Sequence, residues 1–171
     1  SEIRAQELQE FDMSDTTITI CQGLLYDSGG ETGLYANNSN ITTVINTGGV
    51  ITLTFQGVFS IENILDELTI YDGVGIGGPV LGNYTGTTLP GTIVATSGAV
   101  TLVFTSDNSA VYAGFTMMWE TELPPPIPPT LSIDPSLLCG SNLVQVNFSY
   151  SLACAWVDAA TFTFFRNGSA I

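Results

Sequence analysis

The segment VITLTF, residues 50–55, alternates strictly between apolar and polar side chains, and this pattern decides the fold class. In an extended chain Ile51, Leu53 and Phe55 point to one side, and the threonines between them point to the other. We therefore expect a half-buried β-strand whose apolar face contributes to a core.

The same alternation recurs in VTLVFT, residues 100–105, where Val100, Leu102 and Phe104 share a face. Segments rich in Gly, Ser and Asn separate the alternating runs, and these residue types accept tight turns and positive φ. Many short strands with such connections indicate an antiparallel sandwich or barrel and not a βαβ unit. Further strands of this kind are expected in TTITI (16–20), ELTIY (67–71) and GFTMMWE (114–120).

The N-terminal segment does not follow this pattern. Over Ser1–Phe11 the spacing of Ile3 and Leu8 predicts a weakly amphipathic helix, with a segment ordered only by a partner as the alternative. Residues 1–15 would then form an acidic arm outside the sandwich. Such an arm can add a strand to the sheet edge of a partner.

Five prolines lie in LPPPIPPT, residues 123–130, and predict an extended polyproline II spacer. Residues 131–171 alternate again, but they are too few for an immunoglobulin-like sandwich of about 100 residues. We therefore expect an all-β chain in four parts, which are an acidic arm (1–15), a β-sandwich (16–122), a proline-rich linker (123–130) and the start of an immunoglobulin-like domain (131–171).

The charge balance limits the partners. Arg4 and Arg166 are the only basic residues against sixteen Asp and Glu, and the net charge is -14 at pH 7. Such a chain repels nucleic-acid phosphates and anionic lipids, so cations, basic proteins or neutral glycans are the expected partners. No apolar run reaches the roughly 18 residues that span a bilayer, and direct membrane insertion is not expected. Abundant Thr, Ser, Asn and Gly are typical of extracellular all-β modules.

The composition also argues against catalysis. The chain has no His and no Lys, which leaves carboxylates and tyrosines as the available bases. A Ser-His-Asp arrangement is therefore impossible within it. Asp66 and Glu67 are adjacent in an expected strand, where they face opposite sides and do not form a catalytic pair. We predict that the protein is not an enzyme.

Three cysteines, Cys21, Cys139 and Cys154, cannot all pair with one another. We expect a disulfide between Cys139 and Cys154, which closes a short loop and stabilises it by about 3 kcal/mol. Cys21 is then left over, and the expectation for it is a buried free thiol. Without His or a CxxC pair, a zinc site has too few ligands.

Several segments follow in order the pattern of CUB domains, over residues 21–122. The resemblance implies a compact antiparallel β-sandwich of an extracellular protein. Two cysteines usual in the family are missing, since Asn46 and Thr85 stand near their positions. The matching segments are CQGLLYDSGG, ITLTFQGVFSIE, DELTIYDG, LGNYTGTTLPGTIVATSG and TLVFTSDNSAVYAGF.

Many CUB domains bind calcium through a Glu and two Asp on neighbouring loops, and the matching positions here are Glu62, Asp66 and Asp107. The resemblance thus implies a Ca²⁺ site, for which hard oxygen ligands are suited, with a solvated acidic rim as the alternative. In the family these carboxylates often capture a basic side chain of a partner. Asp66 and Asp107 are therefore expected to bind a partner's Lys or Arg. Tyr71 lies nearby in sequence as a further partner-binding candidate, with a role in a turn as the alternative.

The segments CQGLLYDSGG and ANNSN look like those of large Bacteroidota surface proteins that the type IX system secretes, including adhesins of gliding bacteria. This resemblance implies the N-terminal part of a long adhesin at the cell surface, associated with the outer membrane. Its partners would be other cell-surface or outer-membrane proteins. The alternative function is calcium-dependent, lectin-like binding of a polysaccharide.

Overall fold

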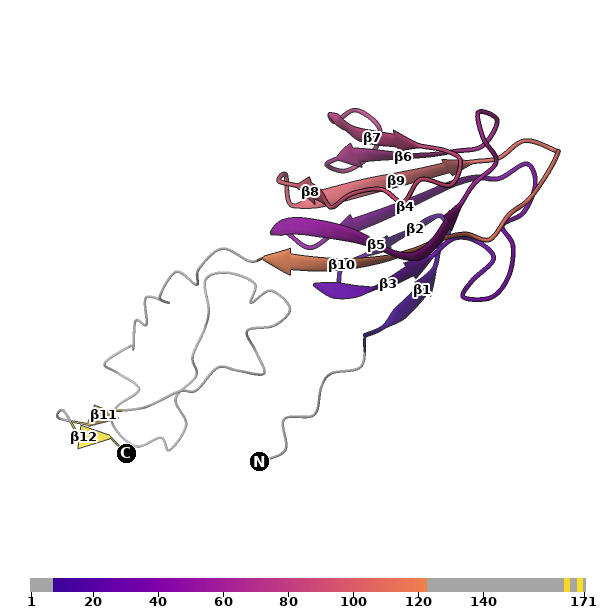
Figure 1. Ribbon diagram of the computed structural model, residues 1–171. Coiled ribbons are helices and arrows are strands. Elements are labelled where there is room, and N and C mark those ends of the chain that lie inside the picture. Colours follow the sequence, from indigo (N-terminus) through magenta and orange to yellow (C-terminus); the bar gives the residue numbers. More distant parts are fainter. Residues whose placement is uncertain (1–7, 123–164, 167–168, 171) are drawn as a thin grey trace. The chain divides into compact units, whose positions relative to one another are not determined.

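The computed structural model describes residues 8–122, 165–166 and 169–170 of the chain. These residues form strands, turns and loops, and no helix occurs among them. Two five-stranded sheets make up residues 8–122 and pack face to face (Figure 1). The expectation of an all-β sandwich is confirmed for this part of the chain.

The first sheet has the order β1-β3-β10-β5-β8 and the second has the order β2-β4-β9-β6-β7. Neighbouring strands run antiparallel, apart from the parallel pairs β1–β3 and β2–β4. The strands of the first sheet are β1 (Glu10–Asp12), β3 (Gln22–Tyr26), β5 (Val50–Ser60), β8 (Ile93–Ala95) and β10 (Gly114–Glu122). Those of the second are β2 (Thr16–Ile18), β4 (Asn40–Asn46), β6 (Glu67–Asp72), β7 (Val80–Tyr84) and β9 (Ala99–Thr105).

The alternating segments form the central strands of the two sheets. In β5 the side chains of Ile51 and Leu53 are fully buried, as the pattern predicts. In β9 the same holds for Val100, Leu102 and Phe104. Strand β9 lies between β4 and β6, so its backbone N–H and C=O groups are paired on both sides.

Aromatic side chains fill one end of the core, where β5 and β9 end and β10 begins. The rings of Phe59 and Phe115 stack with centroids 6.4 Å apart, and Phe104 meets Phe115 edge to face. Tyr35 packs against Phe104 with ring centroids 5.0 Å apart. These rings give the loops at this end a rigid base.

Where the structure describes the N-terminal segment, from residue 8 onward, it belongs to the sandwich and forms no helix. Residues Glu10–Asp12 form β1, which pairs in parallel with β3, so the expected helix is wrong for this part. Met13 is 3% exposed and inserts between the sheets, and the chain then joins the second sheet as β2. Burial of Met13 and pairing of the backbone override the weak helical spacing. Residues Glu10–Asp12 and Thr16–Ile18 therefore serve as edge strands of this chain's own two sheets, and addition of the arm to a partner's sheet stays a prediction.

The C-terminal part is described only in two short strands, β11 (Phe165–Arg166) and β12 (Ser169–Ala170), which pair antiparallel. The expected polyproline spacer and most of the expected immunoglobulin-like start lie outside the described residues. The chain separates into two compact units, residues 1–123 and 124–171. The four-part division stays a prediction.

Cys21, just before β3, corrects another expectation. This residue is disulfide-bonded, so the expectation of a free thiol is wrong. Cys139 and Cys154 lie outside the described residues, and the bridge between them stays a prediction. The chain has three cysteines, so a disulfide from Cys21 to either of the other two would exclude a bridge between Cys139 and Cys154. The prediction paired the two cysteines that are closest in sequence, but a disulfide forms only between cysteines that the tertiary structure brings close together.

Among the residues that the structure describes, Trp119 of β10 is the largest fully buried side chain, and a glycine makes room for it. Its indole N–H donates a hydrogen bond to the carbonyl oxygen of Ile20 at 3.1 Å. A Cβ at Gly23, on the neighbouring strand β3, would overlap the edge of the indole ring. Phe11 of β1 covers Trp119 from another side, with ring centroids 5.8 Å apart.

We predict that Gly23→Ala lowers the free energy of unfolding by about 1–3 kcal/mol, because the added methyl displaces a closely packed indole. Urea denaturation measures the change. Gly77→Ala is the matched control, since no atom lies within 4 Å of a Cβ built there. Equal stability of the two variants would contradict this account of the packing.

Candidate functional site

Three carboxylates meet at the aromatic end of the sandwich. Glu62 follows β5, Asp66 directly precedes β6, and Asp107 follows β9. One carboxylate oxygen from each lies within 4.8 Å of the others. The structure thus brings together the three residues predicted as metal ligands, which we call the acidic cluster.

Asp66 is the fixed member of the acidic cluster because its side chain is fully buried. The Tyr35 hydroxyl donates a hydrogen bond of 2.6 Å to its Oδ2, and the backbone N–H of Asp107 donates one of 2.8 Å to its Oδ1. The Tyr35 oxygen in turn accepts the backbone N–H of Glu62 at 2.9 Å. Burial, together with the hydrogen bond to Asp66, raises the pKa of Tyr35, which keeps its proton on the phenol.

Glu62 and Asp107 are the partly exposed members of the acidic cluster. The Ser109 hydroxyl lies 2.8 Å from Oε2 of Glu62 and 2.5 Å from Oδ1 of Asp107, where its single proton serves both. The Ser109 backbone N–H also donates to Oδ1 of Asp107 at 2.7 Å. These hydrogen bonds from Ser109 lower the pKa of Asp107, so this carboxylate is ionised at neutral pH.

No basic side chain of the described sandwich balances this negative charge, since the chain has no Lys, Arg or His between Arg4 and Arg166. The other oxygens of Glu62 and Asp107 accept no hydrogen bond from residues 8–122. Converging oxygens of this kind, with lone pairs left over, fit a hard divalent cation. Chemically, the acidic cluster can hold an ion or receive a cationic group.

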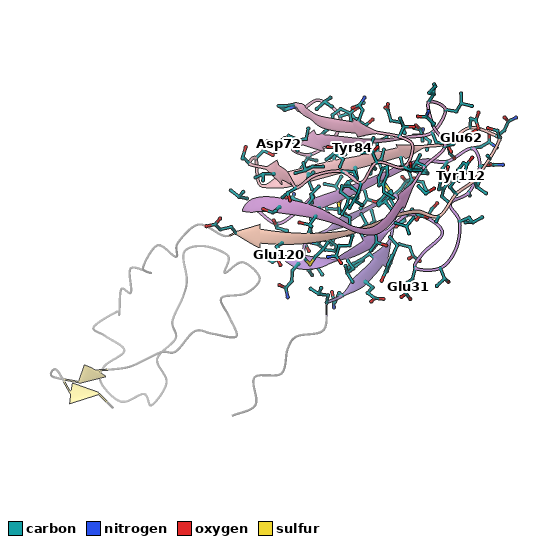
Figure 2. The ribbon with its side chains drawn as sticks, in the orientation of Figure 1. Glu31, Glu62, Asp72, Tyr84, Tyr112 and Glu120 are labelled. Atoms are coloured by element: carbon teal, nitrogen blue, oxygen red, sulfur yellow. The ribbon has the colours of Figure 1, made fainter. Side chains whose placement is uncertain are left out.

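Tyr71 does not join the acidic cluster. It stands five residues after Asp66 along β6, which places it about 16 Å away. Tyr71 pairs with Thr101 and Val80 near the end of the sandwich that holds Asp72, opposite Glu62 (Figure 2). Neighbours in the sequence of a strand are carried apart by its extension, so the predicted grouping of Tyr71 with Asp66 is not found.

Asp72 holds together the turn at that opposite end. Its carboxylate accepts hydrogen bonds from the backbone N–H and the hydroxyl of both Thr96 and Ser97, the shortest being 2.7 Å from the Ser97 hydroxyl. These bonds, led by that of the Ser97 hydroxyl, lower the pKa of Asp72. Asp72 thus has a structural role in this turn.

Sequence reasoning missed Tyr35 and Ser109. Tyr35 lies 31 residues before Asp66, and no local pattern connects the two. Ser109 had a local signal, because an Asp followed two positions later by Ser is typical of a side-chain turn. That signal was present in TSDNS, residues 105–109.

Comparisons of this chain with a family model, with curated proteins and with solved structures agree with one another. The sequence model of the CUB domain matches residues 35–119. Cubilin of Canis lupus familiaris is 37% identical over 79 residues, which cover 44% of this chain and 2% of the cubilin. Cubilin of Rattus norvegicus is 31% identical over 108 residues, which cover 56% of this chain and 3% of the cubilin. The chain thus spans a small fraction of the length of these relatives.

Solved structures show the same fold. The MASP-1 CUB2 domain bound to Ca²⁺ aligns with a TM-score of 0.54 at 24% identity, covering 63% of this chain and 99% of that one. The full extracellular region of zebrafish Gpr126/Adgrg6 aligns with a TM-score of 0.54 at 21% identity, covering 63% of this chain and 14% of that one. The part of the chain that the structure describes contains no helix long and apolar enough to cross a membrane.

We predict that Tyr35→Phe lowers the free energy of unfolding by about 1–3 kcal/mol, because the buried Asp66 loses a donor and the N–H of Glu62 loses its acceptor. Thermal or urea unfolding measures the loss. Tyr112→Phe is the control, since Tyr112 is 42% exposed. Equal losses in both variants would show that the Tyr35 hydroxyl has no special role.

Asp72→Asn should destabilise the protein at neutral pH but have little effect in acid. The pKa of Asp72 in the folded protein lies below that in the unfolded chain, which is about 3.9. The stability that its ionised form contributes is therefore fully present above the unfolded pKa and is lost as the pH falls through the folded pKa. Urea unfolding between neutral and acidic pH measures the difference from wild type. Glu120→Gln, on the exposed end of β10, is the control. A difference from wild type that does not shrink in acid would contradict the assignment.

Proposed function

This chain contains a CUB domain, and we propose that it is a non-catalytic extracellular module that holds another protein through the acidic cluster. The observation that carries the proposal is three converging carboxylates without a basic counter-charge in the sandwich. Similarity to the extracellular region of zebrafish Gpr126/Adgrg6 supports the extracellular setting. The absence of His and Lys supports a binding role over a catalytic one.

Glu62, Asp66 and Asp107 would be the ligands of a Ca²⁺ ion, with water or backbone carbonyls completing its coordination. The donor set fits, because the cluster offers only hard oxygen atoms and Tyr35 fixes the orientation of Asp66. The related fold of the MASP-1 CUB2 domain is known with Ca²⁺ bound, which supports the same ion here. Bound calcium would relieve the repulsion among the three carboxylates and fix the loops that carry them.

The partner would present a Lys or Arg to this surface. Glu62 and Asp107 are partly exposed and can accept charge-assisted hydrogen bonds from it. Asp66 is fully buried, so it would act on the partner through the ion and the orientation of its neighbours. Tyr71, at the other end of β6, has no part in this binding mode.

The wider setting is a bacterial cell surface. The segments CQGLLYDSGG and ANNSN support a long Bacteroidota adhesin that is secreted by the type IX system and serves gliding or attachment. In that setting the partners are other cell-surface or outer-membrane proteins. A net charge of -14 suits a protein that selects basic groups. A second candidate, calcium-dependent binding of a polysaccharide, is favoured by a polar hollow beside the acidic cluster.

We predict that Ca²⁺ stabilises the wild-type protein by about 2.7 kcal/mol when the ion is present at about 100 times its Kd. Glu62→Gln and Asp107→Asn should each lose most of this gain, because each removes a negative ligand. Isothermal titration with CaCl₂ and thermal unfolding with and without chelator measure the effect. Glu31→Gln, a carboxylate outside the acidic cluster, is the control (Figure 2).

Capture from native cells tests the proposed partner. Wild-type protein with Ca²⁺ should retain an outer-membrane or cell-surface protein that the Asp107→Asn variant and chelator-treated protein do not retain. Identical capture by all three samples, or no stabilisation by Ca²⁺, would overturn the proposed function.

A further inference from the structure

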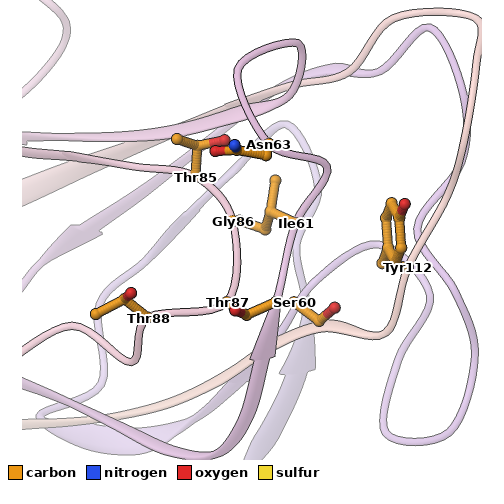
Figure 3. Close-up of a pocket in the computed structure, with 8 residues that line it drawn as sticks. All are labelled: Ser60, Ile61, Asn63, Thr85, Gly86, Thr87, Thr88 and Tyr112. Atoms are coloured by element: carbon orange, nitrogen blue, oxygen red, sulfur yellow. The ribbon is translucent and has the colours of Figure 1, made fainter.

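A hollow of about 370 Å³ lies beside the acidic cluster and is lined entirely by uncharged residues. Figure 3 shows Tyr112 on one side of it, with Ser60 in the middle and the Thr85–Thr88 segment on the other side. Its polar groups are the hydroxyls of Ser60, Thr85, Thr87, Thr88 and Tyr112 and the amide of Asn63. A volume of this size lies at the lower end of small-molecule sites, which measure about 300–1,000 Å³.

The hollow's walls are held by the same segments that carry the acidic cluster. The N–H of Ile61 donates to the carbonyl of Gly86 at 2.9 Å, and the N–H of Ile64 donates to Oγ1 of Thr85 at 2.9 Å. The Thr85 hydroxyl donates to the carbonyl of Glu62 at 2.8 Å. These bonds join the 60–64 segment to the segment at Thr85, so this side of the hollow is formed before a ligand arrives.

The other side is set by the loop that follows Asp107. The carbonyl of Tyr112 accepts the N–H of Tyr35 at 3.3 Å, and Ser109 in the same loop contacts Glu62 and Asp107. The backbone of Tyr112 is therefore anchored, while its side chain is 42% exposed. Because the backbone of Tyr112 is already fixed, a ligand that contacts its exposed ring loses little conformational entropy of the loop on binding.

Ile64 shows that the turn beside the hollow is held in a strained form. Its φ is +77°, a conformation that β-branched residues rarely adopt, and its side chain is 82% exposed. Burial of this side chain therefore does not compensate for the strain. Strain of this kind persists where the surroundings fix the backbone and is concentrated at ligand sites.

The hollow's chemistry selects a neutral polyhydroxyl ligand. Hydroxyl and amide groups both donate and accept hydrogen bonds, as the hydroxyls of a sugar do, and an aromatic ring offers a face for the C–H side of a sugar. Anionic ligands are disfavoured, because Glu62 lies between the lining residues Ile61 and Asn63 and the chain carries a net charge of -14.

We propose that this hollow binds one or two units of a neutral oligosaccharide, with Tyr112 as the stacking surface and Thr87, Thr88, Ser60 and Asn63 as hydrogen-bonding groups. The inference rests on the second candidate function and names its ligand class and its residues. The acidic cluster contributes by fixing the loops on either side of the hollow.

The full chain is tested against an array of neutral gluco-, manno-, galacto- and xylo-oligosaccharides, with uronic-acid and sulfated oligosaccharides for comparison. The strongest neutral sugar is then titrated by calorimetry. We expect binding that Tyr112→Ala weakens at least tenfold and that Tyr112→Phe leaves within about threefold, because Phe keeps the ring. Thr87→Val should also weaken it, whereas Thr92→Val, an exposed threonine outside the hollow, should not.

Thermal unfolding of each variant separates loss of binding from loss of fold. No binding of any neutral oligosaccharide up to about 10 mM, preference for the anionic sugars, or equal binding by Tyr112→Ala and wild type would overturn the inference. Calcium binding is measured separately with CaCl₂ alone. Calcium binding without sugar binding would overturn the sugar site and leave the calcium site standing. Sugar binding without calcium would support the sugar site but overturn its dependence on calcium.

Discussion

The absence of basic side chains is the constraint on which the rest of this structure depends. From residue 5 to residue 165 the chain has no Lys, Arg or His, so its carboxylates must be satisfied by N–H and O–H donors. Asp27, which is 1% exposed, accepts the backbone N–H of Gly29 at 2.7 Å and that of Phe115 at 3.0 Å. Burial still raises its pKa, which shows that two hydrogen bonds do not fully offset the lost hydration.

The two ends of the sandwich meet this constraint in different ways, and the difference is the basis of the function proposed for one of them. At the Asp72 end a single carboxylate receives four hydrogen bonds from a turn, and its lowered pKa shows that the ionised form is well stabilised. At the other end Tyr35 and Ser109 order three carboxylates but leave their combined charge unbalanced. A cation from outside would complete such an arrangement, whereas the carboxylate of Asp72 already has its donors within the turn.

The acidic cluster was predictable as a set of residues but not as a geometry. Glu62, Asp66 and Asp107 were identified through the resemblance to CUB domains, and the structure brings them together. Tyr71 was grouped with Asp66 because it is close in sequence, and strand extension separates them. The reverse holds for Tyr35, which is distant in sequence but lies against Asp66 in the core. Hydrogen bonds between remote segments leave no periodic signal in a sequence.

By itself the sequence predicted the all-β class, which holds for residues 8–122, and the strands with an inward apolar face, and it shows a chain without His or Lys. These properties are local, because a period of two and the available side-chain chemistry can be read from adjacent residues. Tertiary structure alone decided that Glu10–Asp12 pairs as a strand, that Cys21 is disulfide-bonded and that a neutral hollow adjoins the acidic cluster. Each of these depends on segments far apart in the chain meeting in space, and burial and backbone pairing there outweigh local preference.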